Sequence, residues 1–578
     1  MNIFEQTRKD IIGALKEVLP DAQNIDAVTA EPPRDAGHGD IATNAAMVVA
    51  KSAGKNPREL AAALKEKIEK FDYVEKVDIA GPGFINLTIT PARWRLVLKD
   101  VLEHGTGFGN CNIGAGEPIN VEYVSANPTG PMHIGHARGA VYGDALARLL
   151  QKAGYNVTKE YYINDAGNQV NNLARSAYLR YREALGEKIG EIPEGLYPGE
   201  YLKAVGEALA KAEGNRFLNQ PESEWLDYVR TFVLENIMIL IRSDLLELGI
   251  EHDIFSSERK LIDENKVEDA IKLLDKMGLI YQGTLEPPKG QAPEDWEPRE
   301  QTLFKATQFG DDVDRPLKKS DGTNTYFSSD IAYHFDKIKR GFNKMVIVLG
   351  ADHGGYQKRL KAAVKALSNN NASIEIKLYQ LVNFFDDGKP VKMSKRAGTF
   401  LTVKDVVEAV GKDVVRFMML TRKNDVVFDF DFKKVTEQSK DNPVFYVQYA
   451  HARSHSVLRT ALKEIPELKE TDIVFSQAAV DKLTRPEEIE LVKIIAQWPR
   501  MVESAAKYYE PHRIVFYLQE LAAAFHAFWN KGKEDDSLRF IINDDIMLTR
   551  ARLALVKALA TTVASGLQVI GVEPIREM

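Results

Sequence analysis

The stretch Asn127-Pro-Thr-Gly-Pro-Met-His-Ile-Gly-His136 decides the fold that we expect for this chain. A strand-like run at 118–125 precedes it, and a helix-like run at 137–150 follows it. A strand, a turn rich in glycine and proline, and then a helix present backbone N–H groups and the positive end of a helix dipole to a phosphate. We therefore expect this turn to bind ATP and the other segments to complete the site.

The sequence around this turn has a strand–helix–strand order. Another strand is predicted at 157–163, and this order indicates a parallel sheet with its ligand at the carboxyl ends of the strands. Later strands are predicted at 325–327, 345–349 and 374–381, with helices between them. The expected fold class is therefore α/β, with a Rossmann-like parallel-sheet catalytic domain at residues 113–440.

The two ends of the chain differ from this central part. Residues 1–112 combine helical patterns with short strands and predict a separate N-terminal α/β domain. From 441 to 578 apolar residues recur at helical spacing, which predicts a C-terminal all-α helical bundle. Much of 185–300 is helical in pattern and interrupted by glycine and proline, so we expect an insertion into the sheet domain there.

Composition limits the class of protein. The chain has 578 residues, of which 44% are hydrophobic and 28% charged, as in folded proteins of two to four domains. A net charge of −7 argues against indiscriminate binding of nucleic acid but allows local basic patches for RNA. One cysteine, Cys111, excludes an intrachain disulfide and a cysteine-rich zinc site. We see neither a signal-peptide pattern nor an apolar run long enough to span a bilayer, and we expect a cytoplasmic protein.

Two histidines in the opening stretch are candidates for phosphate contacts. His133 and His136 are spaced i, i+3 at a helix start, which directs both side chains to one region. Gly130 and Gly135 leave room for a nucleotide. The imidazoles can donate hydrogen bonds to triphosphate oxygens as charge develops. The alternative is a pair of surface or capping histidines.

A second candidate is the basic loop around Lys392-Met393-Ser394-Lys395, which Arg396 follows. Glycines bound this segment, so it can close over a ligand and neutralise the charge of a diphosphate leaving group. The alternative is a solvated basic loop. The chain has no GxxxxGK[ST] pattern, so phosphate binding of the P-loop kind is not supported.

Together, His133-Ile-Gly-His136 and Lys392-Met-Ser-Lys395 resemble, in this order, the two signatures of class I aminoacyl-tRNA synthetases. The surrounding sequence is similar to arginyl-tRNA synthetases of the bacterial type. The segments that carry this similarity are Val121–Gly139, Tyr162–Gln169 and Asn442–Arg453, and those that resemble the family's additional tRNA-binding domain are His38–Asn44 and Gly81–Asn86. The resemblance covers essentially the whole chain.

The resemblance implies a reaction and a set of partners. Such an enzyme uses ATP to attach L-arginine to tRNA(Arg) through arginyl-adenylate, releasing diphosphate and AMP, and is expected to need bound tRNA even for the first step. It implies a D-loop-binding domain at 1–112, a class I catalytic domain at 113–440 and an anticodon-binding domain at 441–578. Mg²⁺ is expected with ATP, without a dedicated protein metal site. The expected partners are tRNA(Arg), L-arginine and ATP, with no membrane, and the protein is expected to be a monomer.

The resemblance also assigns residues to the substrates. Those implied to bind ATP are Thr129, Gly130, His133, Gly135, His136, Lys392, Met393, Ser394 and Lys395, with His133, His136, Lys392 and Lys395 as the catalytic group. Those implied to bind arginine are Glu122, Ser125, Asn127, His133, Tyr326, Asp330 and His353. A guanidinium pairs bidentately with carboxylates, so Asp330 is the candidate for that end and Asn127 for the α-amino or carboxylate end. Alternatively, Asp330 is the N-cap of the helix that it begins in the predicted pattern.

For tRNA, family position implicates Phe84, Asn86, Tyr446, Tyr449 and Arg453. The first two suit stacking on, and reading of, one unstacked D-loop base, whereas the alternative is a core phenylalanine and a turn asparagine. The last three share a helix face that suits stacking on anticodon bases or, alternatively, helix packing. His451 and His455 have the i, i+4 spacing of metal ligands, but we expect no metal there.

Two other classes of protein were weighed. A small-molecule nucleotidyltransferase can carry a similar HxGH turn, but it would not need the N-terminal domain or the long helical C-terminus. A catalytically inactive RNA-binding module is the non-enzyme alternative, and two intact signatures argue against it.

Overall fold

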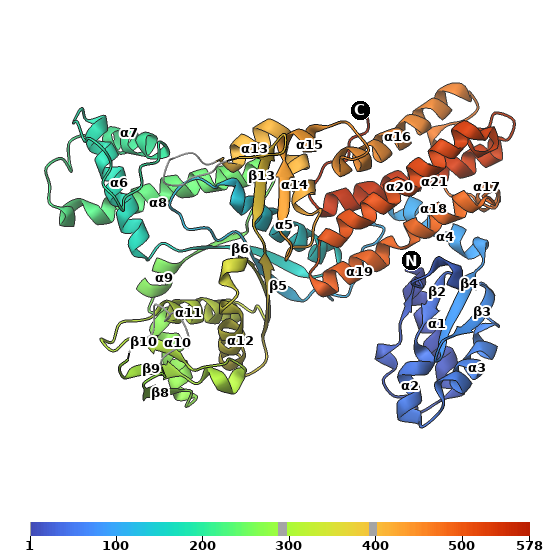
Figure 1. Cartoon of the computed structure of the whole chain (residues 1–578), viewed down its shortest axis with the longest axis horizontal. Coiled ribbons are helices and arrows are strands. Elements are labelled where there is room, and N and C mark those ends of the chain that lie inside the picture. Colours follow the sequence, from blue (N-terminus) through green and yellow to red (C-terminus); the bar gives the residue numbers. More distant parts are fainter. Residues whose placement is uncertain (1, 287–297, 392–400) are drawn as a thin grey trace.

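The computed structural model describes residues 2–286, 298–391 and 401–578, and its elements form a sheet domain with helical parts at both ends (Figure 1). The N-terminal part has a four-stranded sheet in the order β1-β2-β4-β3, covered by helices. Its elements are α1 (Ile3–Val18), β1 (Ala30–Glu31), β2 (Ile41–Thr43), α2 (Ala45–Ala53), α3 (Pro57–Ile68), β3 (Val74–Ala80) and β4 (Phe84–Ile89), followed by α4 (Pro91–His104). This confirms the N-terminal α/β unit.

The central sheet has five strands in the order β12-β11-β5-β6-β7, and all of its pairings are parallel. Its strands are β5 (Pro118–Glu122), β6 (Asn156–Ile163), β7 (Ile254–Ser257), β11 (Lys344–Gly350) and β12 (Ser373–Tyr379). The middle strand β5 is buried on both faces, and Ile119, Asn120 and Val121 are all fully inaccessible. Such burial is typical of parallel sheets covered by helices, and the predicted Rossmann-like domain is confirmed.

Helix α5 (Ala137–Lys152) begins at the opening turn and lies in the middle of the molecule, since thirteen of its sixteen residues are buried. Two charged residues of α5 join distant segments. The Arg138 guanidinium donates to the carbonyls of Gln380, Lys423 and Val426. Asp144 accepts from the buried Arg416, at 2.5 Å.

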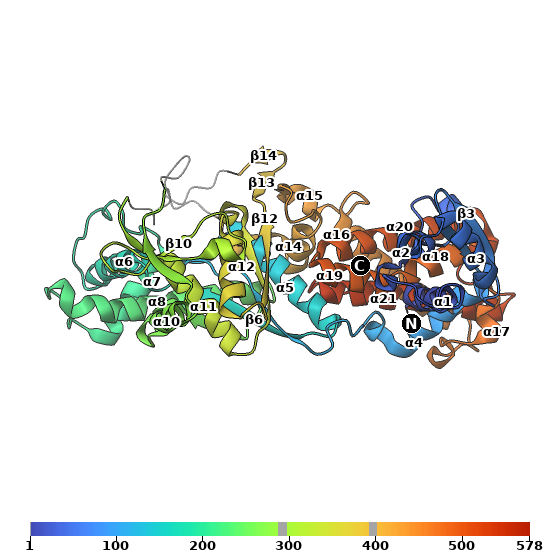
Figure 2. The same cartoon turned by 90° about the horizontal axis from the view of Figure 1, so that it is seen from below.

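The range 185–300 is only partly an insertion. Helices α6 (Asn168–Ala184), α7 (Tyr201–Glu213) and α8 (Glu222–Glu247) form a lobe at the end of the molecule opposite the C-terminal bundle (Figures 1 and 2). However, β7 lies within this range and pairs with β6 in the central sheet. The strand is only four residues long and half of it is serine, so the sequence pattern did not reveal it.

A second small unit follows β7. It contains α9 (Glu258–Asp263), α10 (Lys266–Lys276) and a sheet of β8 (Ile280–Gly283), β9 (Gln301–Phe304) and β10 (Arg315–Lys318). The strand predicted at 325–327 is wrong, because α11 (Tyr326–Lys339) begins there after the N-cap residue Thr325. Thr-Tyr-Phe favours a strand locally, but Phe327 and Ile331 face a buried core at helical spacing. Helix α12 (Tyr356–Leu367) joins β11 to β12.

The C-terminal part is helical, as predicted. Strands β13 (Val382–Asp386), β14 (Lys389–Pro390) and β15 (Phe428–Asp431), with α13 (Val403–Val410), α14 (Lys412–Met419) and α15 (Phe432–Thr436), lead into it. The bundle contains α16 (Pro443–Glu464), α17 (Gln477–Val480), α18 (Pro486–Ala496), α19 (Trp498–Tyr508), α20 (His512–Glu534) and α21 (Ile546–Val569). An ion pair of 2.5 Å between Lys493 and Asp40 joins it to the N-terminal unit. None of the described helices has the length and apolar character needed to cross a membrane.

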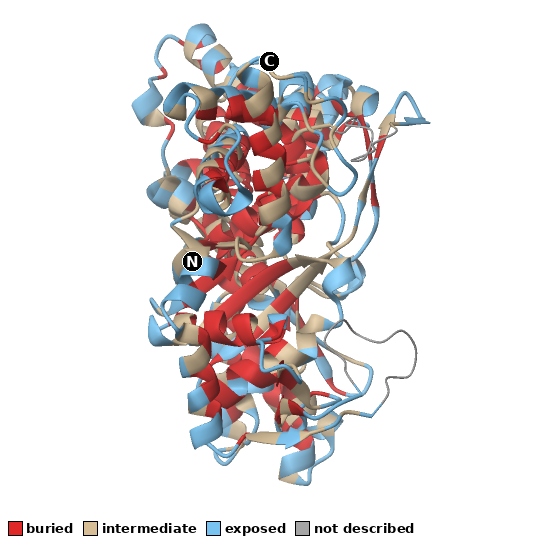
Figure 3. Cartoon of the chain, turned by 90° about the vertical axis from the view of Figure 1, so that its left-hand side faces the viewer, coloured by how far each residue is buried: buried red, intermediate tan, exposed pale blue. Residues whose placement is uncertain are grey.

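Burial is concentrated where the sheet and its covering helices meet (Figure 3). Gly143 illustrates how close this packing is, because a Cβ atom there would overlap the ring of Tyr123 on the chain that leaves β5. Gly143→Ala is therefore expected to lower the free energy of unfolding by about 1–3 kcal/mol through overpacking. Urea unfolding followed by circular dichroism measures the change.

Gly13→Ala is the matched control. Gly13 also lies inside a helix, α1, but no atom lies within 4 Å of the position that its Cβ would take. Alanine there is expected to stabilise by about 0.5–1 kcal/mol, as it does in an exposed helix interior. Equal effects of the two substitutions would contradict the packing argument.

Candidate functional site

The site begins where the chain leaves β5. Val124 and Ser125 have φ angles of +69° and +40°, the left-handed region that residues with a Cβ seldom adopt. Side-chain contacts hold this conformation: the Ser125 hydroxyl donates to Glu122 at 3.2 Å and accepts the backbone N–H of Tyr162 at 3.0 Å. Backbone strain of this kind costs on the order of 1–3 kcal/mol per residue and is found where a site is held in place.

The two signature histidines lie together. Their ring centroids are 3.7 Å apart and the rings are stacked. His133 caps the turn that follows, because its Nδ1 accepts the N–H of Gly135 at 3.1 Å. A Cβ at Gly135 would come within 2.8 Å of the His133 ring, so only glycine fits there. His133 thus has the capping role of one alternative, and both imidazoles lie side by side at the start of α5.

The second signature, Lys392-Met-Ser-Lys395, lies outside the described residues. The chain immediately after it does reach the first signature. Ile134 donates its N–H to the carbonyl of Leu401 at 3.0 Å, and Val403 donates to the carbonyl of Met132 at 2.9 Å. Backbone hydrogen bonds therefore join the first signature to residues 401–403, which follow the second signature in the sequence.

A cavity of 330 Å³ lies over the turn. Its lining includes Asn127, Thr129, Gly130, His133, His136, Gln169, Tyr197 and Tyr201. Tyr201, at the start of α7, donates its hydroxyl to the carbonyl of Thr129 at 2.5 Å, and a Cβ at Gly130 would come within 2.9 Å of its ring. Asn127 donates to Gln169 at 3.1 Å. The sequence did not predict that Gln169, Tyr197 and Tyr201 line this cavity, because only the fold brings them to the turn.

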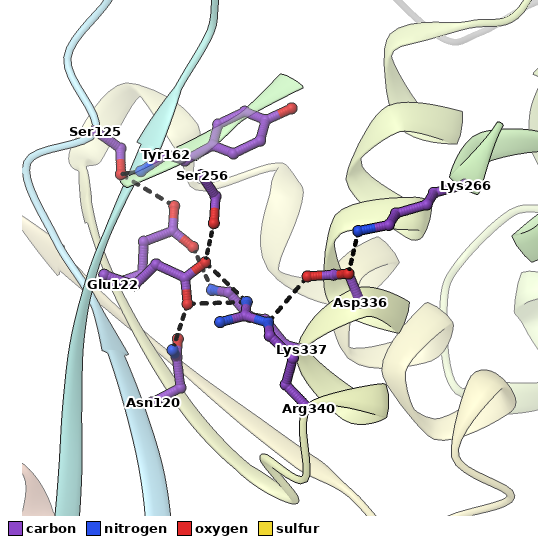
Figure 4. A network of polar contacts seen from close by, with 10 residues as sticks. Asn120, Glu122, Ser125, Tyr162, Ser256, Lys266, Asp336, Lys337 and Arg340 are labelled. Carbon is purple, nitrogen blue, oxygen red and sulfur yellow. Dashed lines mark hydrogen bonds and ion pairs between the residues drawn. The ribbon is translucent and has the colours of Figure 1, made fainter. Parts of the chain in front are cut away.

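Glu122 is buried and already paired. Lys337 of α11, itself fully inaccessible, contacts its carboxylate at 2.6 Å (Figure 4). The neighbouring carboxylate of Glu160 accepts from Arg340, the C-cap residue of the same helix, at 2.8 and 3.0 Å. Burial raises the pKa of Glu160, but the cations of Lys337 and Arg340 outweigh burial and hold this pKa at about 2. Each carboxylate thus faces a cation of the protein.

Other acids gather around Tyr162, at the carboxyl end of β6. Burial raises the pKa of the Tyr162 hydroxyl first, and the charges of Glu258 and Asp330 raise this pKa further. Asp330 lies in the second turn of α11, whose N-cap is Thr325, so the N-cap alternative for Asp330 is wrong. Tyr326 begins the same helix and is 57% exposed.

Glu258 was missed from the sequence. It is buried, directly follows β7 and begins α9. Because the sequence pattern did not reveal β7, no signal placed Glu258 at the carboxyl end of a strand. Burial raises the pKa of the Glu258 carboxyl, and a hydrogen bond with Ser329 offsets part of this rise. His353 lies at the carboxyl end of β11, the neighbour of β5, and is exposed beside Asp352 and Tyr356.

The residues expected to bind tRNA lie away from this site. Phe84 is 40% exposed at the start of β4, so it is not a core phenylalanine. Asn86 is buried within β4, opposite Ala42 and Asp78, and is not in a turn.

In the bundle, Tyr446, Tyr449 and Arg453 converge on one face of α16. The Arg453 guanidinium lies 4.0 Å from the ring centroid of Tyr449 and 4.8 Å from that of Trp529. His451 is buried and contacts the carbonyl of Ile575 at 2.7 Å, as a structural histidine does.

Models of known protein families match the chain in three consecutive parts. The arginyl tRNA synthetase N terminal domain matches residues 5–89, the catalytic domain of class I (R) tRNA synthetases matches 98–455, and the DALR anticodon binding domain matches 447–578. The chain belongs to the arginyl-tRNA synthetase family. This confirms the expectation drawn from the two signatures.

Relatives agree over the full length. The chain is 58% identical to the arginine–tRNA ligase of Nitrobacter winogradskyi, over 97% of this chain and 95% of that protein. It is 56% identical to that of Parvibaculum lavamentivorans over the whole of both proteins. The solved arginyl-tRNA synthetase of Thermus thermophilus has the same fold, with a TM-score of 0.76 and 20% identity over the whole of both chains.

The Glu122–Lys337 pair allows a direct test of the network in Figure 4. Lys337→Met leaves a buried carboxylate unpaired and is expected to lower the free energy of unfolding by about 3–5 kcal/mol. Adding Glu122→Gln removes the unpaired charge, so the double variant is expected to regain most of this loss. Urea unfolding of the four proteins in the cycle measures the coupling.

The exposed pair of Lys358 and Asp312, at 2.7 Å, is the control. Lys358→Met is expected to change stability by less than about 1 kcal/mol, as for surface ion pairs. If Lys337→Met had no larger effect than Lys358→Met, the buried pair would not support the site.

Proposed function

We propose that this chain attaches L-arginine to tRNA(Arg) through arginyl-adenylate, with release of diphosphate and then AMP. As a member of the arginyl-tRNA synthetase family, it is an arginine–tRNA ligase. The observation that carries the proposal for the site is the position of Glu258 and Asp330. These acids lie near Tyr162 at the carboxyl edge of the sheet whose middle strand leads into the His133–His136 turn. A cationic amino acid and a nucleotide can therefore meet there.

For ATP, we assign the turn and the second signature to one task. Thr129, Gly130 and Gly135 allow close approach of the nucleotide, and the imidazoles of His133 and His136 donate to phosphate oxygens. The loop Lys392-Met393-Ser394-Lys395 adds positive charge where the diphosphate leaves. Catalysis then consists of positioning and charge neutralisation, without a protein nucleophile.

Mg²⁺ is expected to arrive with the ATP phosphates. Among the described residues there is no group of three or more His, Cys, Asp or Glu side chains that could hold a metal ion.

For arginine, we assign Asp330 and Glu258 to the guanidinium, because carboxylates pair with its fork of donors. Glu122 is balanced by Lys337, so with Ser125 and Asn127 it fits the α-amino and carboxylate end instead. Tyr326, His133 and His353 complete this pocket in the proposal.

For tRNA, we assign the exposed ring of Phe84 to a D-loop base. Asn86, which is buried two residues further along β4, is assigned to the support of this strand. Tyr446, Tyr449 and Arg453 are assigned to anticodon bases, since aromatic rings and guanidinium planes stack on unpaired bases. We propose the corresponding domains as 1–112, 113–440 and 441–578, in a monomeric cytoplasmic protein.

One assay tests the overall function. Labelled diphosphate is expected to exchange into ATP only when arginine and tRNA(Arg) are both present. Exchange driven by an unrelated acid without tRNA would indicate a small-molecule nucleotidyltransferase, and absence of all exchange would indicate an inactive RNA-binding module.

Lys395 tests the second signature. Lys395→Ala is expected to slow this exchange by about 10²–10³-fold, as does removal of one preorganised group that stabilises transition-state charge. Arg422→Ala, which also removes one cation, is the control and is expected to leave the rate unchanged. Exchange by Lys395→Ala at the wild-type rate would refute the assignment.

Glu258 tests the arginine pocket. Glu258→Gln is expected to raise the KM for arginine by about 10–100-fold, because a charge-assisted hydrogen bond contributes about 1.5–3 kcal/mol. The KM for ATP is expected to stay the same. Glu264→Gln, an exposed change at the end of the same helix, is the control.

The pH dependence provides a second measurement on Glu258. Because burial raises the pKa of Glu258, its carboxylate becomes neutral at a higher pH than an exposed glutamate does. The KM for arginine in the wild type is therefore expected to rise as pH falls through this raised pKa. Glu258→Gln should lack this step, and an unchanged pH profile in that variant would contradict the assignment.

A further inference from the structure

Met132, the residue before His133, is held through both of its backbone polar groups. Its N–H donates to the carboxylate of Asp244 at 2.7 Å, and its carbonyl accepts from Val403 at 2.9 Å. The first contact comes from α8 in the helical lobe, and the second comes from the start of α13, just after the second signature. Helices α8 and α13 also contact each other (Figure 1).

Asp244 is an unusual residue for this position. It is 7% exposed and lies near the end of α8, on the same buried face of this helix as Ile241 and Leu245. A leucine at such a position would bury apolar surface without the cost of desolvating a carboxylate. The hydrogen bond to Met132 is a role that leucine could not take at this position.

The surroundings of Asp244 act on its pKa in opposite directions. Burial raises its pKa to about 6, and the N–H of Met132 and the charge of Lys404 limit this rise, whereas Glu247 and Asp405 add to it. Lys404 and Asp405 belong to α13, so charges of this helix also act on Asp244. A negative acceptor makes the bond to the Met132 amide stronger than a neutral one would.

We propose that Asp244 is a positioning residue for adenylate formation. It fixes the backbone of the first signature turn against the segment that follows the second signature, and so sets where His133 and His136 stand relative to that segment. This rests on the proposed function, in which the turn binds ATP. Asp244 touches no reacting atom and acts through Met132.

The expected effect is on the rate of chemistry more than on binding. Misplacing a reacting group by about 1 Å can cost up to about 10²-fold in rate. The guanidinium end of the proposed arginine pocket, Glu258 and Asp330, lies on α9 and α11 rather than on the turn that Asp244 holds, so the KM for arginine should change little. The tRNA contacts assigned to Phe84 and to α16 are more distant still.

The test compares Asp244→Ala, Asp244→Asn and Glu247→Ala in the exchange assay with arginine and tRNA(Arg). Asparagine keeps an oxygen that can accept from Met132, whereas alanine removes it. Glu247 is exposed and close by on α8, which makes it the matched control. Thermal unfolding of each protein is measured in parallel, so that rates refer to folded enzyme.

Asp244→Ala is expected to lower kcat by about 10–100-fold, with the KM for arginine and the Kd for tRNA within about 2-fold of wild type. Asp244→Asn is expected to recover most of this loss, and Glu247→Ala to match wild type. Wild-type kcat in Asp244→Ala, or losses that only follow the unfolded fraction, would overturn the proposal.

The variant His136→Ala distinguishes a failure of the positioning role of Asp244 from a failure of the proposed function on which that role rests. If His136→Ala exchanged at the wild-type rate, the assignment of the turn to ATP would fail, whatever the Asp244 variants did. If His136→Ala lost activity and Asp244→Ala did not, only the positioning role would fail.

Discussion

Two carboxylates lie directly opposite each other in the central sheet, and much of the site depends on how their charges are balanced. Glu122 on β5 and Glu160 on β6 are register partners, a placement that is destabilising for like charges. Lys337 of α11 and Arg340, the C-cap residue of this helix, balance them from one face, spaced i, i+3. This face must therefore lie over β5 and β6. Asp330 precedes Lys337 by seven residues, two turns or about 10 Å along the same face, which places it beyond the carboxyl ends of the strands.

The same constraint explains how the opening turn is held. Ser125 depends on Glu122 and on the backbone of Tyr162, so the strained exit from β5 is fixed by the strands that α11 covers. Beyond the turn, α7 and the start of α13 hold the carbonyls of Thr129 and Met132. Residues far apart in the sequence thus set one short backbone segment. An enzyme that works by positioning its substrates, as proposed here, requires such rigidity.

The sequence predicted what local patterns determine. The strand–turn–helix around His133, the parallel sheet and the helical C-terminus follow from periodicity and turn residues, and the structure confirms them. It did not predict β7, whose four residues become a strand only by pairing with β6. The sequence also did not predict that Lys337 is buried and paired. Its pattern is that of a surface lysine on a helix, because its partner Glu122 lies 215 positions away. The predicted loop around Lys395 lies outside the described residues.

Charge balance also bears on selectivity for arginine. Since Glu122 and Glu160 are balanced within the protein, the proposed guanidinium site depends on Glu258 and Asp330. Glu258 is buried, and its hydrogen bond to the hydroxyl of Ser329 brings no positive charge. A neutral amino acid would leave this carboxylate dry and uncompensated, and lysine would supply a single ammonium where a planar fork can reach two carboxylates. Amino acids other than arginine would then bind more weakly, because they leave a buried acid unpaired. This discriminates between arginine and other amino acids more strongly than added apolar contact would.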